Sequence, residues 1–189
     1  VQAPAPTSAP TPALAPASEK ATALAELLDL SADAVFTLGD DTTIQRLEPV
    51  AVSGLVGVAT IAGGEQHTCA VVADGAVHCW GRNASGELGD GSTTDRFTPV
   101  AVSGLSGAIA VGTGKYHTCA VAAGGAVHCW GWNQSSQLGN DSGFGAHTPV
   151  VVNGLSGATA IAAGGEHTCA LVAGGGVHWS AQRPSNCVS

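Results

Sequence analysis

The chain has 189 residues, of which six are Lys or Arg and fourteen are Asp or Glu, and its formal net charge is −8. The six basic residues form no run, so the sequence disfavours nucleic acid and anionic membrane surfaces as partners, because both attract clustered cations. No stretch approaches the roughly 20 apolar residues of a membrane-spanning helix, and we expect no membrane insertion.

The amino-terminal part of the chain has a composition of its own. Residues 1–17 consist almost wholly of Pro, Ala, Thr and Ser and carry no charge, which predicts a disordered linker. Ser18 followed by the apolar residues Leu24, Leu27 and Leu28 predicts one short helix over residues 18–30. The sequence contains no Met, so we interpret the chain as a processed form from which a signal peptide has been removed.

A fifty-residue repeat organises the remainder. Pro49-Val50 returns as Pro99-Val100 and again as Pro149-Val150. The copies are residues 49–98, 99–148 and 149–189, the last being truncated or divergent at its end, and residues 31–48 form a partial repeat. A repeat of this length means that each copy is one supersecondary unit that buries its apolar surface against the next.

Each copy consists of short apolar runs, such as 58–61 and 70–72, separated by Gly-rich turns. This pattern predicts about four antiparallel strands per copy, which is the size of a propeller blade. The predicted fold class is all-β, a partial β-propeller of about three four-stranded blades. Because rings usually have four to eight blades, we consider a head-to-tail assembly in which residues 38–49 of one chain complete the last blade of another. A capped partial propeller and a fragment of a longer protein are the alternatives.

The six cysteines predict three disulfides. Cys69 and Cys79 flank Ala73-Asp74-Gly75, and a three-residue hairpin loop at that point places them opposite each other on paired strands. Cys119 and Cys129 repeat the arrangement, and Cys187 is the candidate partner of Cys169. A metal site that also uses His67 and His78 is an alternative, although strand alternation turns His78 to the other face; free thiols are another. An even number of paired cysteines favours an oxidising compartment, so we expect an extracellular or cell-surface protein.

The residues common to the copies have a recognisable pattern. Gly64, His67 and Ala70 precede Trp80-Gly81, Asn83 and Leu88-Gly89, and the same residues return fifty positions later. This pattern resembles the repeat of the regulator of chromosome condensation family. The resemblance implies β-propeller blades, and it implies that His67, His117 and His167 are structural hydrogen-bonding residues. The functions it implies are diverse, because the family's founder is a guanine-nucleotide exchange factor and secreted bacterial relatives include a protein inhibitor of β-lactamases.

The sequence predicts no catalytic residue, no metal site and no cofactor. Candidate Cys and His constellations recur from copy to copy, whereas an active site is normally single. Asp90 and Asp95 superficially suggest a calcium loop, but the alternating acidic positions and the final Glu of such a loop are missing.

Positions that differ between copies are free to serve a partner. The predicted partner-binding residues are Glu65, Gln66, Arg82, Lys115, Tyr116, Trp132 and Glu166. Tyr116 and Trp132 are the expected hot spots, and packing of both side chains on the neighbouring blade is the alternative. We expect a non-catalytic extracellular scaffold that assembles with itself or acts in adhesion at the cell surface. The alternative is a binding module or protein inhibitor that engages an extracellular protein or glycan through the variable loops.

Overall fold

The computed structural model describes residues 51–180, and within this range the chain folds into strands without a helix. The first sheet has the order β1-β2-β3-β4, with bounds Val58–Gly63, His67–Val72, Val77–Gly81 and Arg96–Ala101. The second has the order β5-β6-β7-β8, with bounds Ala108–Thr113, His117–Ala122, Val127–Gly131 and Ala146–Val151. The third has the order β11-β10-β9, and its bounds in chain order are Ala158–Ala163, Thr168–Val172 and Val177–Ser180.

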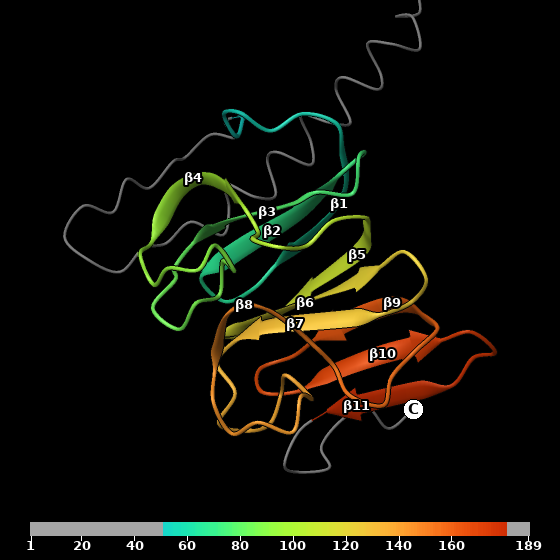
Figure 1. Cartoon of the computed structure of the whole chain (residues 1–189). Coiled ribbons are helices and arrows are strands. Elements are labelled where there is room, and N and C mark those ends of the chain that lie inside the picture. Colours follow the sequence, from blue (N-terminus) through green and yellow to red (C-terminus); the bar gives the residue numbers. More distant parts are fainter. Residues whose placement is uncertain (1–50, 181–189) are drawn as a thin grey trace, which may run out of the picture.

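The three sheets stack side by side along the chain, with β1 against β5 and β5 against β9 (Figure 1). Every neighbouring pair of strands is antiparallel, so each sheet is a blade and the whole is a partial β-propeller. This confirms the predicted fold class. The described part of the third blade has three strands where four were expected. The outer strands β4 and β8 each run from the end of one copy into the start of the next, and the place of an equivalent strand in the third blade lies outside the described residues.

The hairpin between β2 and β3 has the predicted loop. The Gly75 N–H donates to the Val72 carbonyl at 2.8 Å, and the Val72 N–H donates to the Ala76 carbonyl at 2.9 Å. Gly75 has a φ of 83°, and a Cβ at this position would lie 2.7 Å from Cα of Gly107 in the next copy. The tip of the hairpin therefore packs directly on the following blade, and only glycine combines this backbone conformation with this close approach.

The core lies mainly between the blades. One buried cluster joins the sides of the first and second blades and includes Val71, Val77, Leu88 and Trp130. A second cluster, with Val121, Val127 and Leu138, joins the second blade to the third. Each blade thus depends on its neighbour for burial, as expected of a repeat protein.

Several sequence predictions fall outside the described residues. They are the linker 1–17, the helix 18–30, the partial repeat 31–48 and Cys187. Within residues 51–180, no helix has the length and apolar character needed to cross a bilayer.

Candidate binding surface

Two disulfides lie inside the blades, and both follow the predicted pairing. Cys69 is directly opposite Cys79 in the β2–β3 register, with Cα atoms 4.1 Å apart, and Cys119 is bonded to Cys129 in the same way at 4.0 Å. A bridge that closes a loop of ten residues contributes roughly 2–3 kcal/mol to stability. These four sulfurs are therefore covalently paired and are not thiolate ligands. The predicted partner of Cys169 lies outside the described residues.

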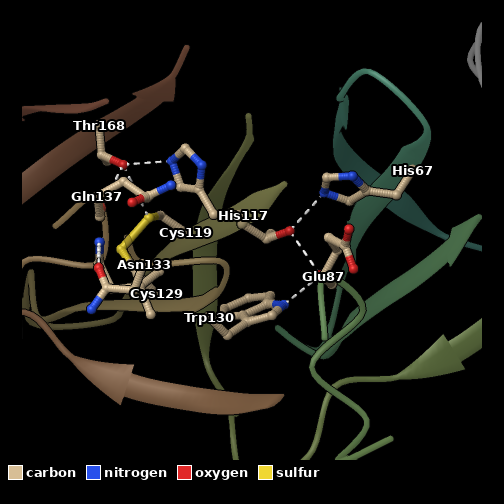
Figure 2. Close-up of a disulfide and its surroundings, with 11 residues drawn as sticks. His67, Glu87, His117, Cys119, Cys129, Trp130, Asn133, Gln137 and Thr168 are labelled. Atoms are coloured by element: carbon tan, nitrogen blue, oxygen red, sulfur yellow. Dashed lines mark hydrogen bonds between the residues drawn. A yellow bond between two sulfur atoms is a disulfide. The ribbon is translucent and has the colours of Figure 1, made fainter. Parts of the chain in front are cut away.

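The repeated histidine is a connector between blades. His67 Nε2 lies 2.8 Å from the Thr118 hydroxyl in the second blade, and that hydroxyl donates to the Glu87 carbonyl at 2.9 Å. Because the single hydroxyl proton goes to Glu87, the His67 ring donates its Nε2 proton to Thr118. Trp130 Nε1 donates to the same Glu87 carbonyl at 2.7 Å (Figure 2). One carbonyl of the first blade thus holds two side chains of the second.

The next pair of blades repeats the histidine connection. His117 Nε2 lies 2.8 Å from the Thr168 hydroxyl, which donates to the Gln137 carbonyl at 3.1 Å (Figure 2). Burial, followed by the neighbouring imidazole of His117, lowers the pKa of His67 to about 3. Burial and then His167 lower the pKa of His117 to about 4. Both rings are neutral framework groups at pH 7, as the family resemblance implies for His67 and His117.

Asn83 organises the long loop that follows β3. Its amide nitrogen donates to the Asp90 side chain at 3.2 Å and to the Thr94 carbonyl at 3.1 Å, and its amide oxygen accepts the Leu88 N–H at 2.9 Å. Asp90 also pairs with Arg96 at 3.1 Å. The backbone N–H of Asn83 donates to the Asp95 carboxylate at 2.7 Å, so both acidic groups of the loop that suggested a calcium site are engaged. Among the described residues, no three His, Cys, Asp or Glu side chains gather in a way that would hold a metal ion.

Five of the predicted partner-binding residues meet at the boundary between the first and second blades. Lys115 Nζ lies 3.4 Å from the Glu65 carboxylate and 5.1 Å from the centre of the Tyr116 ring. The Arg82 guanidinium lies 5.1 Å from the same ring centre and donates to the Gln66 side chain at 2.8 Å. Hydrogen bonding to Glu65 and to Tyr116 raises the pKa of Lys115. We call these five residues the loop cluster.

The loop cluster explains what Tyr116 does in the free protein. Its ring is half-buried and carries two cations, Arg82 from the neighbouring blade and Lys115 from its own loop. Such cation–π contacts are attractive because the ring face carries partial negative charge. Tyr116 therefore packs on the adjacent blade, which was the alternative to a role as a hot spot.

The other two predicted residues continue the same edge of the propeller. Trp132 follows β7 as Arg82 follows β3, and its N–H donates to the Tyr116 carbonyl at 2.8 Å. Glu166 accepts the Ser135 hydroxyl at 3.1 Å across the second blade boundary. Trp132 is 37 % exposed, so this aromatic side chain is accessible to a partner.

Phe144 is a surface residue that the sequence analysis did not single out. It is 83 % exposed, and its carbonyl accepts the Asn133 amide at 3.1 Å. A Cβ built on Gly145 would lie 3.7 Å from Cα of Trp132, so the segment of Phe144 runs beside Trp132. The first blade has Arg82 and Thr94 at the equivalent positions. The change of these two positions to aromatic residues in the second copy was the sequence signal that could have identified Phe144.

Comparison with known families settles the relationship of the blades. The model of the regulator of chromosome condensation (RCC1) repeat matches residues 74–121 and 124–171, and a second model of this repeat matches residues 58–87 and 108–137. The chain belongs to the RCC1 repeat family. Propellers built from RCC1 repeats are typically protein-binding modules, and RCC1-repeat proteins are generally binding or regulatory proteins.

Several solved structures have a similar fold. Human WBSCR16 has 22 % identity and a TM-score of 0.66, with 76 % of this chain and 38 % of that chain covered. Prp20p from Saccharomyces cerevisiae, described with its binding properties to Gsp1p and histones, has 21 % identity and a TM-score of 0.57 over 67 % of this chain and 33 % of that one. Yeast RCC1 (Prp20) bound to Kap60 has 19 % identity and a TM-score of 0.58 over 76 % and 36 %. The chain thus spans about a third of the length of these proteins. No curated protein matches its sequence.

Proposed function

We propose that the chain is a non-catalytic, extracellular protein-binding module whose partner contacts the edge formed by the loop cluster, Trp132, Phe144 and Glu166. The observation that carries the proposal is the pair of accessible aromatic side chains, Trp132 and Phe144, on neighbouring loop segments. Large aromatic groups contribute most of the binding energy in protein interfaces. Charges of both signs border the pair and favour a partner with a mixed, complementary surface.

Three further observations support this role. His67 and His117 are engaged in blade-to-blade hydrogen bonds, and four of the repeated cysteines are engaged in disulfides, which accounts for these side chains without catalysis. Disulfides persist in oxidising compartments, so the two pairs favour a location outside the cytoplasm. Residues of the edge differ between copies while the framework residues recur, as expected when the edge serves recognition.

The test is comparative capture of proteins from the extracellular fraction of the source cells. The bait is the wild-type chain, the double variant Trp132→Ala/Phe144→Ala, or the control Val56→Ala. Val56 is also 83 % exposed, but it precedes β1 and lies at the opposite end of the strands from the loops at 64–66 and 114–116. A partner retained by wild type and Val56→Ala and lost by the double variant supports the proposal. Equal capture by all three refutes it.

A second candidate, self-assembly, rests on the outer edge of the third blade. Among residues 51–180, β11 has a strand partner only on its β10 side, whereas the equivalent strands β3 and β7 each pair with a further strand. That further strand in the first blade, β4, reads Arg-Phe-Thr-Pro-Val-Ala, and residues 46–51 read Arg-Leu-Glu-Pro-Val-Ala. We propose that residues 46–51 of one copy pair with β11 of another.

Native mass spectrometry of the unreduced chain tests this assembly. The proposal predicts a multimer for wild type and for Val56→Asp, and a monomer for Val50→Asp, because Val50 corresponds to Val100 at the middle of the β3–β4 pairing. A monomeric wild type rules out self-assembly while leaving the partner-binding role intact.

A further inference from the structure

The two blade boundaries of the structure differ at one position. In the second blade Trp130 is paired with Thr118 across the β6–β7 register. In the third blade the residue paired with Thr168 is Ser180, and Trp179 is one place earlier, opposite Cys169. The position that carries the indole at the first boundary therefore carries a serine at the second.

At the first boundary the Trp130 indole fills the space between the blades. The side chain is fully buried, and it belongs to the cluster that contains Val77, Val102, Val111 and Ala120. The ring also lies so close to Gly89 that a Cβ there would be 2.8 Å from Nε1. An indole is thus an integral part of the packing at this boundary.

At the second boundary, the residues equivalent to those around Trp130 line a pocket. Its volume is about 220 Å³, and its lining includes Val127, Gly139, Val152, Ile161 and Ala170. Each of these residues is fifty positions after a residue that surrounds Trp130 at the first boundary. An enclosed apolar cavity of roughly 150 Å³ is enough to bind benzene, so the volume of this pocket is sufficient for a bicyclic ring.

We infer that this pocket between the second and third blades binds a free, flat aromatic molecule of the size of indole. The chain itself provides the template, because an indole occupies the equivalent space one repeat earlier. A peptide-borne tryptophan fits less well, since Trp130 enters its site from the β7 backbone and the β11 backbone already occupies the corresponding place. A small molecule needs no such backbone path.

Methyl NMR of the full chain with added indole tests the inference. We expect shifts of the Val127, Val152 and Ile161 methyl signals that saturate with a dissociation constant on the order of 1 mM or below. The equivalent methyl groups of Val77, Val102 and Val111 are the internal control and should not shift, because Trp130 fills their site. N-acetyltryptophanamide, the peptide-like probe, should bind about tenfold more weakly or not at all.

Two variants at one position complete the test. Ser180→Trp supplies the side chain present at the first boundary and should abolish the indole-induced shifts, while Ser180→Ala should leave them unchanged. Absence of shifts in wild type, or shifts of equal size at both boundaries, overturns the inference, and this readout does not depend on the folding of any variant. Equal affinity for N-acetyltryptophanamide overturns the assignment to a small molecule.

Discussion

The buried histidines predict a large loss of stability in mild acid. Burial lowers the pKa of His67 to about 3 and that of His117 to about 4, whereas an unfolded histidine titrates near 6.5. At pH values between the folded and the unfolded pKa, these histidines bind protons in the unfolded chain but not in the folded chain. The stability associated with the neutral rings is therefore complete above pH 6.5 and decreases as the pH falls toward the folded values.

The size of the effect follows from the two sets of pKa values. For one ring that stays neutral in the fold and titrates at 6.5 when unfolded, the free energy of unfolding at pH 5 is lower by about 2 kcal/mol. His67 and His117 together account for about 4 kcal/mol, a large part of the 5–15 kcal/mol typical of a domain. Glu87 acts in the opposite direction, because burial raises the pKa of its carboxyl and proton uptake then favours the fold.

Urea unfolding at pH 7, 6 and 5, followed by tryptophan fluorescence, measures the loss. The parent for this experiment is Glu87→Gln, which removes the opposing carboxyl. We expect about 4 kcal/mol less stability at pH 5 than at pH 7, and about half that loss when His117→Gln is added. Constant stability between pH 7 and pH 5, or the same loss with and without His117, would refute the assignment of these rings as buried and neutral.

Three further predictions concern single substitutions in the blade framework. Glu87→Gln should raise the free energy of unfolding at pH 7 by about 1 kcal/mol. The reason is that the second copy has Gln137 in this place, and Gln137 accepts the Ser135 N–H as Glu87 accepts the Ser85 N–H. A lower free energy of unfolding in chemical denaturation at pH 7 would contradict this prediction. Thr118→Val should lower the free energy of unfolding by about 2–3 kcal/mol, because His67 and the Glu87 carbonyl lose the hydroxyl that they contact. Thr118→Ser keeps the hydroxyl and should lower it by under about half of that. Equal losses of stability in thermal unfolding would argue against the hydrogen-bonded connection between the blades. Gly75→Ala should lower the melting temperature more than Gly104→Ala. Both glycines have positive φ, but of the two only Gly75 would place a Cβ 2.7 Å from Cα of Gly107 in the next blade. Equal shifts would mean that this close approach does not add to the destabilisation.

Local signals explain why the blades were predictable. Cys69 and Cys79 are separated by ten residues around a loop that ends in Gly75, and the left-handed conformation of this glycine fixes the hairpin and the register. Strand length and turn position are likewise encoded within a few residues. The all-β class, the blade pattern and the first two disulfides were therefore accessible from the sequence alone.

Contacts between blades were much less accessible. Arg82 and Tyr116 come together only because successive blades stack, and the sequence identified both residues without identifying their contact. Burial of Glu87 was also missed, since an isolated glutamate is usually exposed; its replacement by Gln137 in the next copy was the one signal. The pocket at the second boundary depends on the strand register that places Ser180 opposite Thr168.

The most direct test of the proposed binding edge is hydrogen exchange of the chain, free and bound to the captured partner. We expect slower amide exchange at residues 64–66, 114–116, 131–133 and 144–145 on binding, with little change at the opposite ends of the strands. Protection confined to residues 53–57, 103–107 and 153–157, or to β11, would place the partner elsewhere and refute the proposed binding edge.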